Sequence, residues 1–151
     1  MSNRKNRIEY LEAAEKVERF KLVVVGQDPY PKGANGIAFC KNTFDEFFDS
    51  YCCGKEVLYS LGYSKEAVVS KNENPLELFY GLLAQGIAFV NVSSVLLDDA
   101  TDLKLSADKV YNENFLSKTD QIVVLGKSKT TKLFKFGKSI VMRYFKIKFV
   151  T

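Results

Sequence analysis

The sequence predicts an α/β fold: a three-layer domain in which a four-stranded, mainly parallel sheet has helices on both faces. The first reason is that four strand-like runs, at residues 21–25, 87–91, 121–126 and 139–149, alternate with helix-like segments. The second reason is that these runs are largely apolar and do not alternate strictly between apolar and polar residues. Such runs are typical of parallel strands that are buried on both faces.

The length of the chain limits it to one domain. With 151 residues, 46% of them apolar, it is expected to form a single core over residues 1–151. No apolar run is long enough to span a bilayer, and the charged N-terminus has no apolar stretch behind it, so a cytoplasmic protein is the simplest interpretation. The three cysteines, Cys40, Cys52 and Cys53, are expected to be reduced thiols because their number is odd and two are adjacent.

The first half of the chain predicts two helices around the first strand. Apolar residues recur at spacing three in a partial helical stripe, formed by Ile8, Leu11, Ala14 and Val17. Thr43 and Glu46 have the spacing of a capping box, which begins a helix. The aromatic residues after it predict a face turned toward the core: Phe44, Phe47, Phe48 and Tyr51.

The second half of the chain continues the alternation. Asn74 is expected to cap a helix that has Pro75 in its first turn and ends at Gly86, directly before the strand 87–91. Further helices are predicted at 106–118, before the third strand, and at 128–136, before the fourth. The segments 54–74 and 96–106 give no clear helix or strand signal, and the second is predicted to be a polar loop.

Two features of the composition restrict the chemistry. The chain has no histidine, which excludes an imidazole base or ligand, and its cysteine spacing does not form a zinc site. Neither a metal nor a cofactor is therefore expected. Residues 121–151 hold eight Lys and Arg side chains and no Asp or Glu, so they carry +8, while residues 1–120 carry −4. This segregation suits a polyanion such as DNA, although a solvated lysine-rich helix face and edge strand would give the same pattern.

Three loops are expected to meet at the carboxyl edge of the sheet, where α/β folds bind ligands. They begin at Gly26, Asn91 and Gly126, each directly after a predicted strand. The first has the sequence GQDPYPKGANGIAF, which places the carboxylate of Asp28 where an apolar strand has just ended.

Together these loops resemble uracil-DNA glycosylases. The run Gly26-Gln27-Asp28-Pro29-Tyr30 matches the family's water-activating GQDPYH motif in five consecutive residues. It is followed by Gly36-Ile37-Ala38-Phe39, which resembles the family's G-L-x-F segment. The run 85–91, QGIAFVN, resembles the strand that the family ends with asparagine, and VVLGKSKTTKLFK is a weaker match to its later strand, glycine and helix. The resemblance covers roughly residues 20 to 145.

The resemblance implies a role for each matched side chain. Asp28 would position the attacking water and stabilise the cationic sugar, and the backbone around Gln27 would hold a carbonyl of the base. Tyr30 would occupy the space of a thymine methyl group, Phe39 would stack on a flipped uracil, and Asn91 would bind its polar edge. The side chains expected to contact DNA phosphates are Lys127, Ser128, Lys129, Lys132 and Lys146.

Each of these residues also has a purely structural interpretation. Asp28 could be a turn residue whose carboxylate accepts backbone N–H bonds. Phe39 could be an ordinary core aromatic residue, and Asn91 could cap the loop that follows it. A two-residue lysine pair on an edge strand would equally explain Lys146 and Lys148.

The chain departs from the family in ways that leave its activity open. The family's HPSPLS motif, whose histidine donates to the departing uracil and whose leucine fills the emptied stack, is missing, and Pro31 replaces the histidine of GQDPYH.

Three function classes remain. One is a glycosylase of reduced activity that prefers single-stranded DNA, and another is an inactive glycosylase-fold module that binds DNA beside a replication or repair partner. The third is a small-molecule nucleotide-binding α/β protein.

Overall fold

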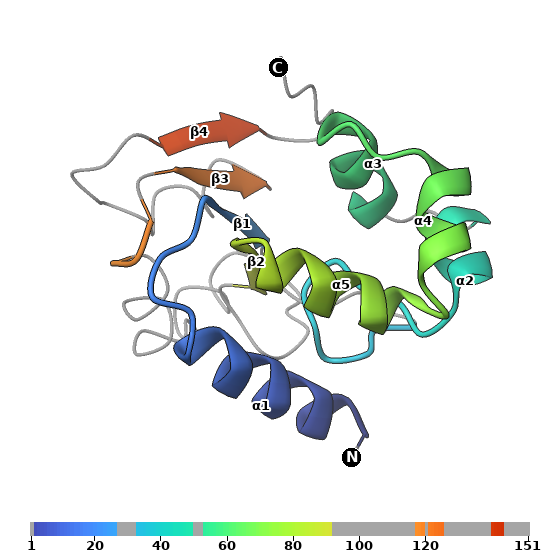
Figure 1. The fold of residues 1–151 in the computed structure, drawn as a ribbon, viewed down its shortest axis with the longest axis horizontal. Coiled ribbons are helices and arrows are strands. Elements are labelled where there is room, and N and C mark those ends of the chain that lie inside the picture. The colour runs from blue at the N-terminus through green and yellow to red at the C-terminus, as the bar shows by residue number, and fades with distance from the viewer. Residues whose placement is uncertain are drawn as a thin grey trace, which may run out of the picture.

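The structure is a computed structural model, and Figure 1 shows its fold. It describes residues 2–26, 33–49, 53–91, 117–119, 121–125 and 140–143. Within these parts, one helix precedes the first strand and four helices lie between the first and second strands. In chain order the elements are α1 (Ser2–Glu15), β1 (Leu22–Gly26), α2 (Phe44–Asp49), α3 (Cys53–Ser60), α4 (Lys65–Lys71), α5 (Pro75–Ala84), β2 (Ile87–Asn91), β3 (Ile122–Leu125) and β4 (Ile140–Arg143).

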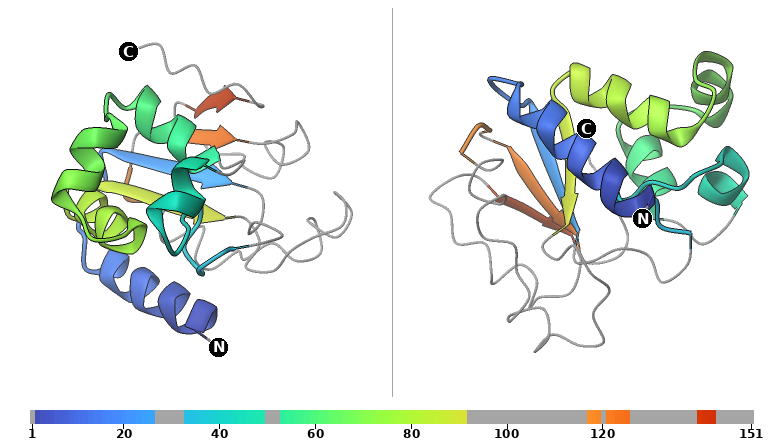
Figure 2. Two further views of the ribbon diagram at one scale, coloured as in Figure 1. Left: turned by 90° about the vertical axis from the view of Figure 1, so that its right-hand side faces the viewer. Right: turned by 90° about the horizontal axis from the view of Figure 1, so that it is seen from below.

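The strands form one open sheet in the order β2-β1-β3-β4, and every pairing in it is parallel. Val24 of β1 lies between Phe89 of β2 and Val123 of β3, so these three side chains share one face. Figure 2 (left) shows the strands pointing the same way, which brings their carboxyl ends to one edge. The predicted α/β class with a parallel sheet is confirmed.

Both faces of the central strand β1 are buried. Val23, Val24 and Val25 are each 0% exposed, although successive side chains of a strand point to opposite faces. Figure 2 (right) shows α2 to α5 on one side of the sheet, with α1 running beside β2. The helices predicted at 106–118 and 128–136, which would form the other layer, lie outside the described residues apart from 117–118, where the chain makes a turn.

The helix α5 has the boundaries that its sequence predicts. The Asn74 side chain accepts a hydrogen bond from the Glu77 backbone N–H at 2.9 Å, and the Glu77 carboxylate accepts one from the Glu73 N–H at 2.9 Å. Pro75 occupies the first position, where its missing N–H costs nothing. Gly86 ends the segment with a φ of 90°, and its carbonyl accepts the Lys21 N–H at 2.7 Å.

The segment 54–74, which gives no clear signal in the sequence, contains α3 and α4. Gly62, with a φ of 95°, ends α3 in a Schellman motif, in which the Tyr63 N–H donates to Leu58 and the Gly62 N–H to Tyr59. Ser64 then caps α4 by accepting the Ala67 N–H at 3.2 Å. Both helices are shorter than three turns, so their apolar periodicity is too brief to read from the sequence.

The helix α1 closes the edge of the sheet at β2. The Tyr10 hydroxyl, in a side chain 2% exposed, accepts a hydrogen bond from the Phe89 backbone N–H at 3.0 Å. The Phe89 N–H lies at the open edge of β2, and without the Tyr10 hydroxyl it would have no acceptor on the side of α1. The inward side of α1 therefore includes Tyr10 and Ala14. Of the predicted apolar stripe, Ala14 is buried, Leu11 and Val17 pack against the core, and Ile8 is 39% exposed.

Tyr10 also packs edge-on against Tyr80 of α5, with ring centroids 5.6 Å apart. Burial raises the pKa of the Tyr80 phenol, and the nearby carboxylate of Glu9 raises it further. Both effects favour the neutral phenol over the phenolate. The contact between α1 and α5 therefore includes a group whose charge state affects stability only in alkaline solution.

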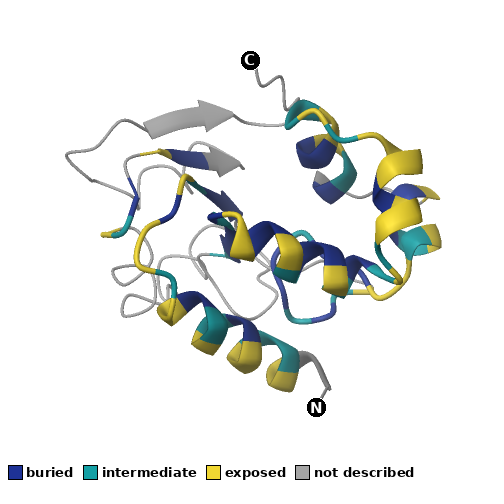
Figure 3. Cartoon of the chain, viewed as in Figure 1, coloured by how far each residue is buried: buried dark blue, intermediate teal, exposed yellow. Residues whose placement is uncertain are grey.

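The core between α2, α5 and the sheet is aromatic. Phe47 meets Phe79 edge-on at 5.9 Å, and Phe79 packs on Phe89 at 4.7 Å. In Figure 3 the ribbon of α5 alternates between buried and exposed residues, whereas β1 is coloured as buried over most of its length. Of the aromatic face predicted for the second helix, Phe47 and Phe48 are buried, and Tyr51 lies outside the described residues.

The structure tests the predictions about membrane-spanning helices and about the cysteines over the described residues. In the described parts, no helix has the length and apolar character needed to cross a bilayer. Cys40 is buried and is not part of a disulfide, as predicted, whereas Cys52 lies outside the described residues.

Candidate functional site

The candidate site lies at the carboxyl end of β1. Gly26, the last residue of β1, is in register with Asn91, the last residue of β2. The strand order reverses between β1 and β3, so the carboxyl end of β1 borders the point at which open α/β sheets bind ligands. The residues 27–32, which carry the GQDPY motif, follow directly but lie outside the described residues.

Two of the predicted site residues meet over Gly26. A Cβ atom placed on Gly26 would lie 2.6 Å from the Asn91 carboxamide oxygen Oδ1 and 2.8 Å from Cζ of the Phe39 ring. Both side chains therefore reach over the same α-carbon, although one belongs to β2 and the other to the loop between β1 and α2. The lack of a side chain at Gly26 provides the room for them.

The backbone of Phe39 is strained. Its φ of 67° lies in the left-handed region, which costs about 1–3 kcal/mol for a residue other than glycine. The Cys40 N–H donates to the Ile37 carbonyl at 3.2 Å and closes a tight turn in which Phe39 is the third residue. A positive φ at this position is the pattern of a type II turn, which usually has glycine there. The surrounding contacts must therefore hold Phe39 in this conformation.

The ring and the carbonyl of Phe39 contact separate parts of the fold. The ring is partly buried and meets Phe89 of β2 edge-on, with centroids 6.0 Å apart. A Cβ on Gly54, in the first turn of α3, would overlap the Phe39 carbonyl oxygen, so α3 approaches this backbone too closely for any other residue. Phe39 thus has both a core contact and an uncovered part, and the structural and the ligand-stacking interpretations are compatible.

The loop that carries Phe39 is closed at its base. Ala34 and Lys41 form an antiparallel bridge, and the Lys41 residue is only 6% exposed. A Cβ on Gly33 would lie 3.0 Å from the Lys41 ammonium nitrogen and 2.7 Å from a carboxylate oxygen of Glu46. The loop therefore begins and ends at one place, beside the start of α2.

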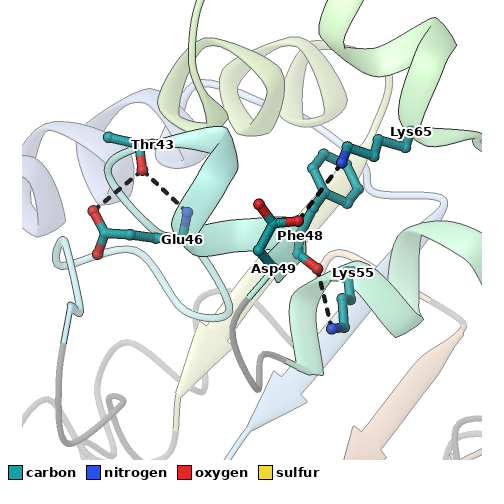
Figure 4. Close-up of polar contacts among 6 residues, drawn as sticks. All are labelled: Thr43, Glu46, Phe48, Asp49, Lys55 and Lys65. Atoms are coloured by element: carbon teal, nitrogen blue, oxygen red, sulfur yellow. Dashed lines mark hydrogen bonds and ion pairs between the residues drawn. The ribbon is translucent and has the colours of Figure 1, made fainter.

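The helix α2, which follows this loop, is fixed at both ends, as Figure 4 shows. At its start, Thr43 Oγ1 accepts the Glu46 N–H at 3.1 Å and donates to the Glu46 carboxylate at 3.3 Å, which confirms the predicted capping. At its end, Lys55 of α3 donates to the Phe48 carbonyl at 3.2 Å. Lys65 of α4 lies over the Phe48 ring at 5.6 Å.

Asn35 is a buried residue of the loop that sequence reasoning missed. It is 0% exposed, and its side chain bonds to the backbone of Ile37 and Lys41. In the sequence it is one residue in GANG, a pattern that indicates only a turn. No periodicity or motif points to its burial, because its partners come from the closure of the loop.

A separate cavity of about 220 Å³ lies between α4 and α5. It is lined mainly by apolar side chains, among them Val68, Leu78 and Leu82, and Gln85 at its rim precedes β2. This cavity is therefore at the amino end of β2, whereas Phe39 and Asn91 meet at the carboxyl end. Neither Phe39 nor Asn91, the two predicted site residues within the described ranges, lines it.

The remaining predicted site residues cannot be placed. Those that lie outside the described residues are Gln27, Asp28, Tyr30, Lys127, Ser128, Lys129, Lys132 and Lys146. Over the described ranges, no group of three or more Cys, Asp and Glu side chains is arranged to hold a metal ion. Phe39 and Asn91 are thus the two predicted residues that the structure brings together.

Comparison with known proteins adds no further assignment. Neither a model of a protein family nor a curated protein matches this chain. The resemblance to uracil-DNA glycosylases, which depends on the short runs around Gly26, Gly36 and Gln85, therefore stays a prediction.

Proposed function

We propose that this protein is uracil-DNA glycosylase-like: it recognises uracil in DNA and hydrolyses the N-glycosidic bond at a reduced rate. The main support is that Phe39 and Asn91 meet over Gly26, the first residue of the GQDPY run. An extruded base has an aromatic face and a polar edge, and a phenyl ring beside a carboxamide can bind both. We also propose that the complete fold, with its four-stranded sheet, is that of a uracil-DNA glycosylase.

The catalytic group in this proposal is Asp28. It follows Gly26 by two residues, and consecutive Cα atoms are about 3.8 Å apart, so chain connectivity favours a carboxylate at the same edge. Asp28 would hold the water whose oxygen bonds to the sugar C1′. The bond from C1′ to the base nitrogen breaks, and its electron pair leaves with the uracil ring. The proton that the water loses passes to the Asp28 carboxylate, and solvent protonates the uracil anion. The carboxylate would also stabilise the positive charge that develops on the sugar.

The reduced rate follows from what the chain lacks. No histidine is available to donate a hydrogen bond to the departing base, and the loss of one such donor costs about 100- to 1000-fold in rate. The leucine that would fill the emptied stack is missing with the rest of that motif. Since extrusion from a duplex costs a few kcal/mol of unstacking and unpairing, we expect single-stranded DNA to be the better substrate.

The decisive experiment measures free uracil released from an oligonucleotide with one deoxyuridine, as a single strand and as a duplex. The matched control is the Asp28→Asn protein, which keeps the size of the side chain and removes its charge. Release that is faster from the single strand and lost in Asp28→Asn would support the proposal. Equal release by both proteins would contradict it.

The absence of histidine also favours a second candidate, a catalytically inactive module that binds DNA beside a replication or repair partner. This candidate shares the basic segment 121–151 with the first and differs in having no chemical step. Binding of single-stranded DNA without any release of uracil, even after long incubation, would favour the module.

A further inference from the structure

The side chain of Asn35 holds the backbone on both sides of Phe39. Its oxygen Oδ1 accepts the Ile37 N–H at 3.1 Å, and its nitrogen Nδ2 donates to the Lys41 carbonyl at 3.0 Å and to the Cys40 sulfur at 3.2 Å. Ile37 precedes Phe39 by two residues, while Cys40 and Lys41 follow it. A single carboxamide therefore spans the turn in which Phe39 is strained.

The same residue connects this turn to the sheet. The Asn35 backbone carbonyl accepts a hydrogen bond from the Asn6 side chain of α1 at 2.9 Å. One turn further along α1, Tyr10 is bonded to the Phe89 N–H of β2. The chain of contacts from Asn35 through α1 to β2 thus sets the loop against the strand that carries Asn91.

The chemistry of the position requires a carboxamide. The Asn35 side chain accepts one hydrogen bond through its oxygen and donates two through its nitrogen. Neither a carboxylate nor a hydroxyl group has one acceptor and two donors. Aspartate would keep the acceptor for Ile37 but turn a second oxygen toward the Lys41 carbonyl. Glutamine has the right groups on a side chain one methylene longer, in a site that is 0% exposed.

We infer that Asn35 is a positioning residue: it holds the Phe39 ring over Gly26 beside Asn91 and thereby sets the affinity of the site for a base. This inference rests on the proposed function for its ligand, a base in single-stranded DNA. Asn35 itself is buried and does not touch the ligand. Its effect on binding therefore passes through Phe39 alone.

The test is a double-mutant cycle in the Asp28→Asn background, which prevents cleavage. The measured quantity is the ratio of affinities for two single strands, one with deoxyuridine and one with thymidine at the same place. We expect Phe39→Ala to lower the affinity for the deoxyuridine strand by roughly 5- to 150-fold, the change that corresponds to stacking of one base on an aromatic ring. The ratio should fall with it, because Tyr30 would keep thymine off this ring. Asn35→Ala should lower it in the same direction.

Two results separate positioning from a merely structural role. In the Phe39→Ala protein, adding Asn35→Ala should change the ratio no further, because the residue it positions is gone. The control Asn72→Ala removes another asparagine bond, from Nδ2 to the Val68 carbonyl at 3.0 Å, far from Phe39. It should lower stability and leave the ratio unchanged. Additive losses in the double variant, or an equal loss in Asn72→Ala, would overturn the inference.

A readout without DNA keeps this test distinct from the proposed function. In protein labelled with 4-fluorophenylalanine, the ¹⁹F resonance of Phe39 is identified by its loss in Phe39→Leu. It should shift in the milder variant Asn35→Asp and stay in place in Asn72→Ala. An unshifted resonance would overturn the inference whatever the protein binds. A shifted resonance in a protein that does not discriminate uracil would leave Asn35 as the positioning residue and contradict the proposed function.

Discussion

Gly26→Ala is the most direct test of the candidate site, because it acts only on the meeting of Phe39 and Asn91. The new methyl group would lie 2.6 Å from Asn91 Oδ1 and 2.8 Å from Phe39 Cζ, whereas ordinary contacts begin near 3.4 Å. The φ of Gly26 is outside the left-handed region, so alanine causes no backbone strain there. Any effect must therefore come from displacing these two side chains.

The expected cost of Gly26→Ala is about 1–3 kcal/mol of unfolding free energy, the usual result of forcing an extra carbon into packed surroundings. A larger effect is expected on the uracil-to-thymine affinity ratio, since both base-contacting side chains would move. Urea unfolding measures the first quantity. Fluorescence anisotropy of labelled single strands measures the second.

Gly81→Ala is the matched control. Gly81 lies within α5, and a Cβ on it would meet nothing within 4 Å. Because glycine inside a helix is less stable than alanine, this variant should gain about 0.5–1 kcal/mol and leave the affinity ratio unchanged. If Gly26→Ala were as stable as the unsubstituted protein and kept its affinity ratio, Phe39 and Asn91 would not meet over Gly26 in solution.

Three further predictions concern activity, pH and DNA contact. Asp28→Asn should abolish uracil release, and the remaining activity of the unsubstituted protein should be higher on single strands than on duplexes; equal rates on the two would refute the unstacking argument. Because the pKa of Tyr80 is raised in the folded state, its contribution to stability is fully present below pH 10 and is lost as the pH rises through the folded-state pKa. Tyr80→Phe should therefore weaken the decline of the urea midpoint in alkaline solution. If the midpoint declined with pH as steeply as before, Tyr80 would titrate alike in the folded and unfolded states. Changing Lys127 and Lys129 to glutamate should weaken the binding of single-stranded DNA equally for all sequences. The slope of the logarithm of the binding constant against the logarithm of salt concentration should become shallower by about 1.4. An unchanged slope would mean that neither lysine contacts a phosphate.

The elements that the sequence predicted well are those with local signals. The helix α5 begins at the asparagine cap and proline that predict its start, and β2 covers the residues 87–91 that predict it. Caps and short apolar runs act through neighbouring residues, so they can be read without knowledge of the rest of the fold. The capping of α2 by Thr43 is visible in the sequence for the same reason.

Other features depend on contacts between distant residues and have no local signal. The helices α3 and α4 are too short to show an apolar period. Tyr10, which bonds to β2, is buried although it is not part of the predicted apolar stripe of α1, and Ile8 of that stripe is exposed. The order β2-β1-β3-β4 is likewise a property of the folded sheet. A sequence period fixes neither which strands pair nor which helix covers an edge.

The candidate site combines both kinds of information. By itself, the sequence determined a parallel α/β fold and selected Phe39 and Asn91 as residues of one site by their resemblance to a family motif. Only the tertiary structure decided that they meet over Gly26, that Phe39 adopts a positive φ, and that Asn35 spans the strained turn. A strained backbone is stable only when contacts from several elements hold it, and such contacts exist only after the chain has folded.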